Sequence, residues 1–96
     1  MQQFVITALD KTDGAAIRAA NRTGHLQYLA AAADHGVKII LAGPLMNNHH
    51  AMIGSHLVLE AESEVVIKAF LAHDPYNMAG LFARVDIYPF KKVLPS

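Results

Sequence analysis

The chain has no cysteine, no excess of charge of either sign and no long hydrophobic run. Without cysteine there is no disulfide bond, no thiolate metal site and no thiol nucleophile. Eight Lys and Arg residues balance eight Asp and Glu residues, so no long-range positive field attracts nucleic acid or an anionic membrane surface. We therefore expect neither nucleic acid nor a membrane among the partners of this chain.

The absence of a membrane-length apolar run and of several known motifs argues against further classes of protein. The apolar run at residues 4–9 is too short to span a membrane, and no basic segment or cleavage signal flanks it. We expect this run to be a strand of the mature fold, and we expect the chain to be cytoplasmic. No Walker loop, GxGxxG fingerprint or GxSxG elbow is present, so nothing predicts nucleotide binding or ester hydrolysis.

Apolar residues are abundant in this short chain. The 96 residues, 53% of them hydrophobic, fit a single domain spanning residues 1–96. This composition fills a core and also leaves an apolar surface. We expect part of that surface to meet a second copy of the chain, in a homodimer or a higher oligomer.

Hydrophobic patterns and turn residues divide the chain into six segments. Residues 2–9, 37–45, 51–60 and 82–89 have the β-branched, aromatic or alternating patterns of strands. Residues 15–35 have the composition of a helix that ends at Gly36. A second helix is expected from its cap, Ser63, to Pro75. Pro44, near the end of its strand, is typical of a sheet edge.

The order strand, helix, strand, strand, helix, strand predicts an α+β fold, the ferredoxin-like split β-α-β sandwich. In this βαββαβ arrangement an antiparallel sheet carries both helices on one face. Ala83, Val85 and Ile87 are expected to face the helices. The residues that alternate with them lie on the second face: Phe82, Arg84, Asp86 and Tyr88. We expect this second face to pack on its copy in a homodimer.

His25 lies on the first predicted helix, at the edge of its buried face. Residues 21–24 (NRTG) favour a break or restart that would put His25 in a first helical turn, where the helix dipole disfavours its charged form. One interpretation is a histidine packed at the helix edge; the other is a functional histidine oriented by a carboxylate. Asp74 is such a carboxylate, because both helices lie side by side in this topology, although Asp before Pro is also ordinary turn chemistry.

Six short motifs follow one another along the chain: residues 22–29 (RTGHLQYL), 43–45 (GPL), 54–55 (GS), 74–76 (DPY), 79–82 (AGLF) and 85–89 (VDIYP). Together they resemble the YCII-related (YciI-like) family of small dimeric α+β barrel proteins, over nearly the whole chain. The resemblance implies that the family's histidine and aspartate, thought to form a catalytic pair in a pocket, fall on His25 and Asp74. It also implies a reaction type, because some relatives eliminate chloride from chlorinated hydroxyquinols.

The first functional hypothesis is a small-molecule enzyme of unknown substrate, a lyase or dehydrochlorinase-like activity, with His25 as general base and Asp74 as its orienter. No metal or organic cofactor is expected. Five further residues are expected to contact the substrate. They are Ser55 and the backbone at Gly43 for a substrate oxygen, Tyr28 and Tyr76 for an aromatic wall, and Arg22 for an anionic group.

Two other functions remain open at this stage. The chain is alternatively a non-catalytic domain that binds a metabolite or only forms dimers. Metal binding by His49, His50 and His56 is the third, and it is disfavoured because adjacent histidines in a loop rarely converge on one ion.

Overall fold

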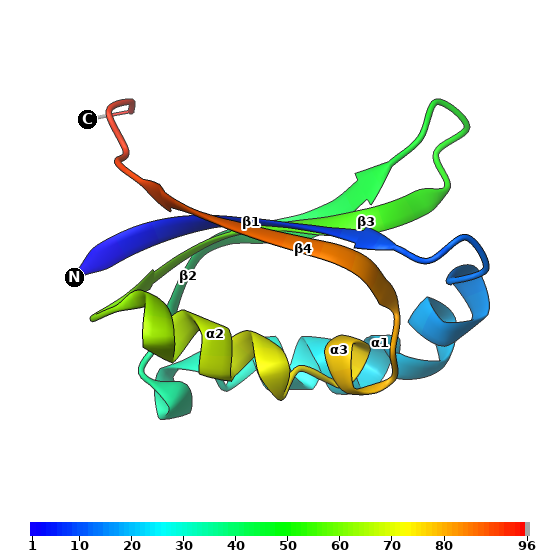
Figure 1. The fold of residues 1–96 in the computed structure, drawn as a ribbon, viewed down its shortest axis with the longest axis horizontal. Coiled ribbons are helices and arrows are strands. Elements are labelled where there is room, and N and C mark those ends of the chain that lie inside the picture. The colour runs from blue at the N-terminus through cyan, green and yellow to red at the C-terminus, as the bar shows by residue number, and fades with distance from the viewer. Residues whose placement is uncertain (96) are drawn as a thin grey trace.

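Four antiparallel strands form one sheet in the computed structural model of the chain, which describes residues 1–95 (Figure 1). The strands are β1 (Gln2–Asp10), β2 (Lys38–Met46), β3 (Met52–Ala61) and β4 (Phe82–Phe90). Their order across the sheet is β2-β3-β1-β4, which places β2 with its Pro44 at an edge, as predicted. The α+β, ferredoxin-like fold class is confirmed.

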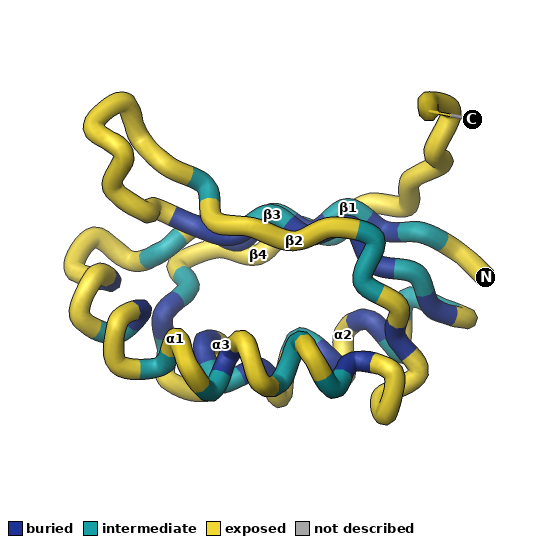
Figure 2. The backbone as a smooth tube through the Cα atoms, turned by 180° about the vertical axis from the view of Figure 1, so that it is seen from behind, coloured by how far each residue is buried: buried dark blue, intermediate teal, exposed yellow. Residues whose placement is uncertain are grey.

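All helices cover one face of this sheet (Figure 1). They are α1 (Ala15–Ala30), the 3-10 helix η1 (Ala32–His35), α2 (Glu64–Ala72) and α3 (Pro75–Met78). Alternate residues of β1, namely Phe4, Ile6 and Ala8, are at most 2% exposed beneath them. Figure 2 shows the helices buried only on the side that meets the sheet. No helix within residues 1–95 is long and apolar enough to cross a membrane.

The predicted break at residues 21–24 is wrong, because α1 runs unbroken through it. Asn21 does not restart the helix; its side-chain amide donates to the Ile17 carbonyl one turn earlier, at 2.9 Å. Gly24 lies against Pro75, so packing between α1 and α3 offsets the low helix propensity of glycine. His25 is therefore in the interior of α1, and the argument from a helix dipole in a first turn does not apply. The helix does end early, with η1 completing the predicted span up to Gly36.

Pro75 starts a helix as well as following one. The second predicted helix is α2, which ends at Ala72, and Pro75 then occupies the first turn of α3, where its missing N–H is not needed. Asp74 is the N-cap of α3. Ser63 stands at the N-cap position of α2, but its side chain makes no capping hydrogen bond, contrary to the prediction.

Phe82 lies on the helix side of the sheet, which corrects the alternation predicted for β4. Leu9 pairs with Arg84 but Asp10 pairs with Phe82, so a bulge removes Ala83 from the ladder. The rings of Phe82 and Tyr76 accordingly meet beneath the sheet with their planes 89° apart and 6.2 Å between centroids. The face turned away from the helices keeps Arg84, Asp86 and Tyr88, as the register with β1 shows.

Candidate active site

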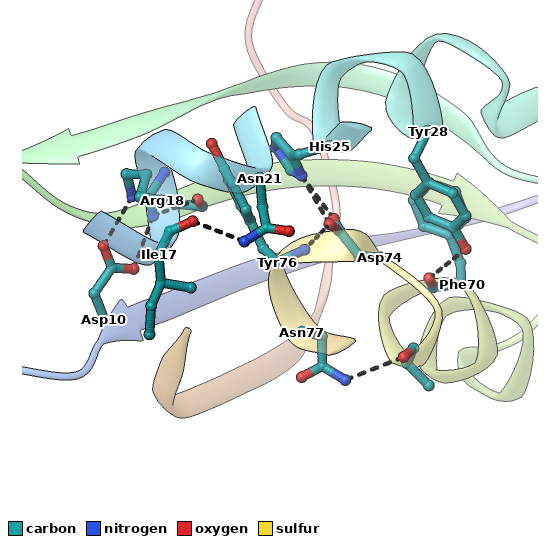
Figure 3. Close-up of polar contacts among 12 residues, drawn as sticks. Asp10, Ile17, Arg18, Asn21, His25, Tyr28, Phe70, Asp74, Tyr76 and Asn77 are labelled. Carbon is teal, nitrogen blue, oxygen red and sulfur yellow. Dashed lines mark hydrogen bonds and ion pairs between the residues drawn. The ribbon is translucent and has the colours of Figure 1, made fainter. Parts of the chain in front are cut away.

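His25 and Asp74 are in direct contact between α1 and the start of α3 (Figure 3). The Nδ1 atom of His25 lies 2.9 Å from both carboxylate oxygens of Asp74. Both residues are buried, with exposed fractions of 8% and 3%. Because a carboxylate only accepts hydrogen bonds, Nδ1 must carry the proton, and in a neutral imidazole this leaves Nε2 as the acceptor.

The backbone around Asp74 holds the carboxylate in place. As the N-cap of α3, its Oδ1 accepts a hydrogen bond from the Tyr76 backbone N–H at 2.9 Å. Pro75 restricts the backbone between these two residues. The carboxylate is thus fixed by the local Asp-Pro-Tyr sequence before it meets the histidine, which is the arrangement of a precise orienting group.

Tyr76 fixes the plane of the histidine ring. The two rings are stacked, with centroids 3.9 Å apart and planes 13° from parallel. Tyr76 is only 2% exposed, and Phe82 packs edge-on against its ring. With a carboxylate at Nδ1 and a ring against its face, His25 has little rotational freedom.

A cavity of about 140 Å³ lies beside His25, between α1 and the strands β2 and β3. Four predicted substrate contacts line it together with His25, namely Arg22, Gly43, Ser55 and Tyr76. Apart from Arg18, the remaining wall is apolar and comes from Leu26, Leu29, Ala42, Pro44, Met52 and Leu57. A few polar groups converging in an apolar cavity are typical of a small-molecule site.

Tyr28 does not belong to this cavity, contrary to the prediction. Its ring stacks on Phe70 with 4.8 Å between centroids, and its hydroxyl donates to the Phe70 carbonyl at 2.7 Å. Burial, with a smaller contribution from the Asp74 carboxylate, raises the pKa of the Tyr28 hydroxyl above its usual 10.0. Tyr28 therefore joins α1 to α2 and has a structural role.

Arg18 is the site residue that the sequence interpretation missed. It lines the cavity although only 6% exposed, and its Nε and Nη2 atoms each donate to Asp10 at 2.8 Å. Burial opposes the Arg18 cation, but the contacts with Asp10 outweigh it and raise its pKa. Arg18 and His25 are two turns apart on α1 and therefore lie on the same side of the helix, and this spacing is the signal that could have placed Arg18 at the site. The signal is weak, because an arginine at the edge of a helix is ordinarily solvated.

The three histidines considered for a metal do not converge. His49 and His50 lie in the turn between β2 and β3, whereas the Nδ1 of His56 contacts the Thr7 hydroxyl at 3.2 Å on the sheet. Within residues 1–95 no group of three His, Cys, Asp or Glu side chains is close enough to hold a metal ion.

Comparison with known sequences identifies one family. The sequence model of the YCII-related domain matches residues 2–91. Protein YciI of Escherichia coli is 36% identical over 96 residues, covering 94% of this chain and 97% of that protein. Protein YciI of Shigella flexneri is similar to the same extent, at 36% identity.

Solved structures give the same fold. The 5-chloro-2-hydroxyhydroquinone dehydrochlorinase of Burkholderia phenoliruptrix, in complex with 2,5-dihydroxybenzoquinone, matches with a TM-score of 0.82 and 32% identity over 93% of each chain. An Arabidopsis thaliana protein matches with a TM-score of 0.57 and 15% identity, over 100% of this chain and 99% of that one, which shows the fold alone.

Proposed function

The chain belongs to the YCII-related domain family, and from this premise we propose that it is a small-molecule enzyme in which His25 is the general base and Asp74 orients it. The contact between His25 Nδ1 and both oxygens of Asp74, at 2.9 Å beside a cavity, is the observation that carries the proposal. A neutral imidazole held in this tautomer takes up a proton at Nε2, and the carboxylate stabilises the imidazolium that forms.

The reaction class we propose is a base-promoted elimination. A substrate C–H or O–H bond breaks, its proton moves to His25 Nε2, and the electron pair left on the substrate expels a leaving group. The dehydrochlorinase at 32% identity supports this class, because its name describes loss of a proton and chloride. No electrons pass between substrate and protein, so the step requires no redox cofactor.

The proposal is tested by measuring chloride release from 5-chloro-2-hydroxyhydroquinone, the compound that appears in the name of that dehydrochlorinase. Wild-type protein should release chloride, and His25→Gln should lower kcat by about 10²- to 10⁴-fold, the usual contribution of a general base. Gln27→Ala, an exposed change two residues away on the same helix, serves as the matched control. Circular dichroism should confirm that both variants fold.

Two outcomes would contradict the proposal. Turnover that persists in His25→Gln would remove the histidine from the mechanism. Wild-type protein that binds the compound without releasing chloride would favour a non-catalytic, metabolite-binding domain.

We also propose that the chain forms a homodimer through the sheet face opposite the helices, here called the open face. Register with β1 places Leu41, Tyr88 and Phe90 on it, and these side chains are 52%, 59% and 43% exposed. Large apolar side chains exposed together on one face of a sheet are typical of a surface that another subunit covers.

A further inference from the structure

The cavity has a second polar side, formed by Arg18 and Ser55, with Asp10 bound to Arg18 behind the lining. Arg18 Nη2 donates to the Ser55 hydroxyl at 3.0 Å as well as to Asp10, and both Arg18 and Ser55 are more than nine-tenths buried, at 6% and 4% exposed. The three groups come from the end of β1, from α1 and from β3. This side is separate from the His25–Asp74 contact, and the proposed base does not use it (Figure 3).

Donor and acceptor roles in this chain of groups are fixed by chemistry. A guanidinium only donates, so the Ser55 oxygen must accept from Arg18, and the single hydroxyl proton of Ser55 must point elsewhere. Within residues 1–95 the Ser55 hydroxyl has no other hydrogen-bond partner. Because Ser55 lines the cavity, its proton is available to a molecule there.

Asp10 and Tyr76 keep Arg18 in the position that serves Ser55. Asp10 binds two nitrogen atoms of the guanidinium, and the Arg18 Cζ lies 4.8 Å from the centroid of the Tyr76 ring. A cation that donates to a hydroxyl oxygen makes that hydroxyl a stronger donor. Arg18, held in place by Asp10, thus polarises the Ser55 hydroxyl through the hydrogen bond that it donates.

The charge of Arg22, which stays uncompensated at the cavity among residues 1–95, favours an anion. The cavity lining contains Arg18, Arg22 and His25 but no Asp or Glu among residues 1–95. The carboxylates of Asp10 and Asp74 lie behind this lining, bound to Arg18 and His25. Arg22 is exposed and makes no ion pair within the same residues, so its charge is not compensated locally.

We propose that Ser55 donates a hydrogen bond to a substrate oxygen that becomes an oxyanion when His25 removes the proton, and that Arg18 is the positioning residue that orients Ser55. The proposal rests on the proposed function and names its substrate class, a hydroxylated conjugated ring whose conjugate base is a phenolate or enolate. The proton moves to His25 Nε2, and the electron pair is delocalised onto the oxygen held by Ser55. In the keto tautomer of a chlorinated substrate, where the carbon that bears chlorine also carries a hydrogen, the return of that pair forms a C=C bond to that carbon and expels chloride.

The test uses 4-nitrocatechol as a probe, because its phenol and phenolate absorb at different wavelengths. Titration of the bound probe against pH should give an apparent pKa at least one unit lower in wild-type protein than in free solution, a tenfold preference for the phenolate. Ser55→Ala and Arg18→Lys should each lose most of this shift. Ser63→Ala and Arg84→Lys make the same chemical changes outside the cavity and should retain it, since Ser63 makes no capping bond and Arg84 pairs with Asp86 in exposed positions.

The probe separates this proposal from the proposed function. A wild-type shift that persists in Ser55→Ala would overturn the oxyanion contact even if chloride release were observed. A shift that is lost in Ser55→Ala but kept in His25→Gln would support the contact even if the wild-type protein released no chloride. Loss of the shift in His25→Gln alone would assign the anion to the imidazolium and overturn the role of Ser55.

Kinetics provides a second readout wherever turnover is measurable. Ser55→Ala should lower kcat by about 10²- to 10³-fold, the usual effect of removing one oxyanion donor, with little change in KM. A change confined to KM would instead assign Ser55 to ground-state binding and overturn the proposal.

Discussion

At the scale of single residues, Tyr28 shows how a buried hydroxyl links stability to pH. The fold raises the pKa of its hydroxyl, through burial first and the Asp74 carboxylate second, so folding favours the neutral form. The stability from this preference is therefore fully present below the unfolded pKa of about 10 and is lost as pH rises through the higher folded value. The hydrogen bond from Tyr28 to the Phe70 carbonyl, which needs that proton, is lost with it.

Tyr28→Phe should lower the free energy of unfolding at pH 7 by about 0.5–1.5 kcal/mol, the usual net contribution of one hydrogen bond. The difference from wild type should shrink above about pH 10, because the wild-type protein then loses the same proton. Urea unfolding of both proteins across pH 7 to 11 measures this, and the other tyrosines cancel in the comparison. A difference that stays constant over the whole range would show that Tyr28 ionises without consequence for the fold.

The predictable residues of the site are those whose function follows from their type. His25, Asp74, Ser55 and Tyr76 were predicted from residue chemistry, topology and resemblance, and they now lie around one cavity or its supporting contacts. Arg18 was not predicted, because its burial depends on a carboxylate from another element, and no sequence rule pairs the end of a strand with the next helix in this way. Tyr28 is misplaced because its residue type favours an aromatic wall but cannot say which neighbour its ring packs against, and the ring stacks on Phe70.

At the scale of elements, Asp74 combines two roles that substitution can separate. It caps α3 through Tyr76 and it orients His25. Asparagine is as good an N-cap as aspartate but cannot accept from Nδ1–H with both side-chain atoms. The cap and the orienting contact should therefore respond differently to Asn and Ala.

Asp74→Asn should keep most of the stability of wild type, whereas Asp74→Ala should lower the free energy of unfolding by about 0.5–2 kcal/mol more, the usual contribution of an N-cap. Both should lower chloride release by about 10²-fold or more, since each removes the carboxylate. Thermal unfolding and kcat, measured side by side, test the separation. Ser63→Ala, at a cap position without a capping bond, should change neither. Equal stability of the Asn and Ala variants would refute the capping role.

The strands contain a glycine that the sheet requires and one that it does not. A Cβ atom on Gly54 in β3 would lie 2.4 Å from the Ala8 carbonyl oxygen of β1, whereas a Cβ on Gly43 in β2 would meet nothing within 4 Å. The clash is with backbone, so no side chain can move to relieve it. This difference is invisible in the sequence, where both glycines simply interrupt apolar strands.

Gly54→Ala should lower the free energy of unfolding by about 1–3 kcal/mol, the range for overpacking, and should reduce the expression of folded protein. Gly43→Ala should leave stability within about 0.5 kcal/mol of wild type. Chemical unfolding of both variants decides the point. Similar stabilities for the two would mean that the β1–β3 pair separates locally at little cost.

The wrong predictions about helices and strands share one physical origin. The sequence patterns located all four strands and both long helices to within a few residues, because alternation and helix formers are local signals. The missed α3, the absent break in α1 and the reversed side of Phe82 all arise where α1, α3 and β4 pack together. Tertiary contacts overrode local propensity there, and that junction is also where the candidate site lies.

At the scale of the whole molecule, the two faces of the sheet differ in what covers them, because all helices lie on one face. The helices lie on one face, and the cavity lies between them and the sheet. The open face carries exposed Leu41 and Tyr88 near its two edges, whereas the outer surface of α2 carries a valine, Val65, that is still more exposed. Exposure alone thus does not mark an interface, and a test of the dimer needs both kinds of position.

If the open face forms the homodimer, Leu41→Glu with Tyr88→Glu should weaken association by bringing like charges into an interface, where juxtaposed charges cost several kcal/mol. Sedimentation equilibrium at micromolar concentration should then show a dimer for wild type and a monomer for the double variant. Val65→Glu, 75% exposed on α2, adds the same kind of charge on the opposite side and should stay dimeric. A monomeric wild type would end the proposal, and a dimer dissociated by Val65→Glu alone would move the interface to the helices.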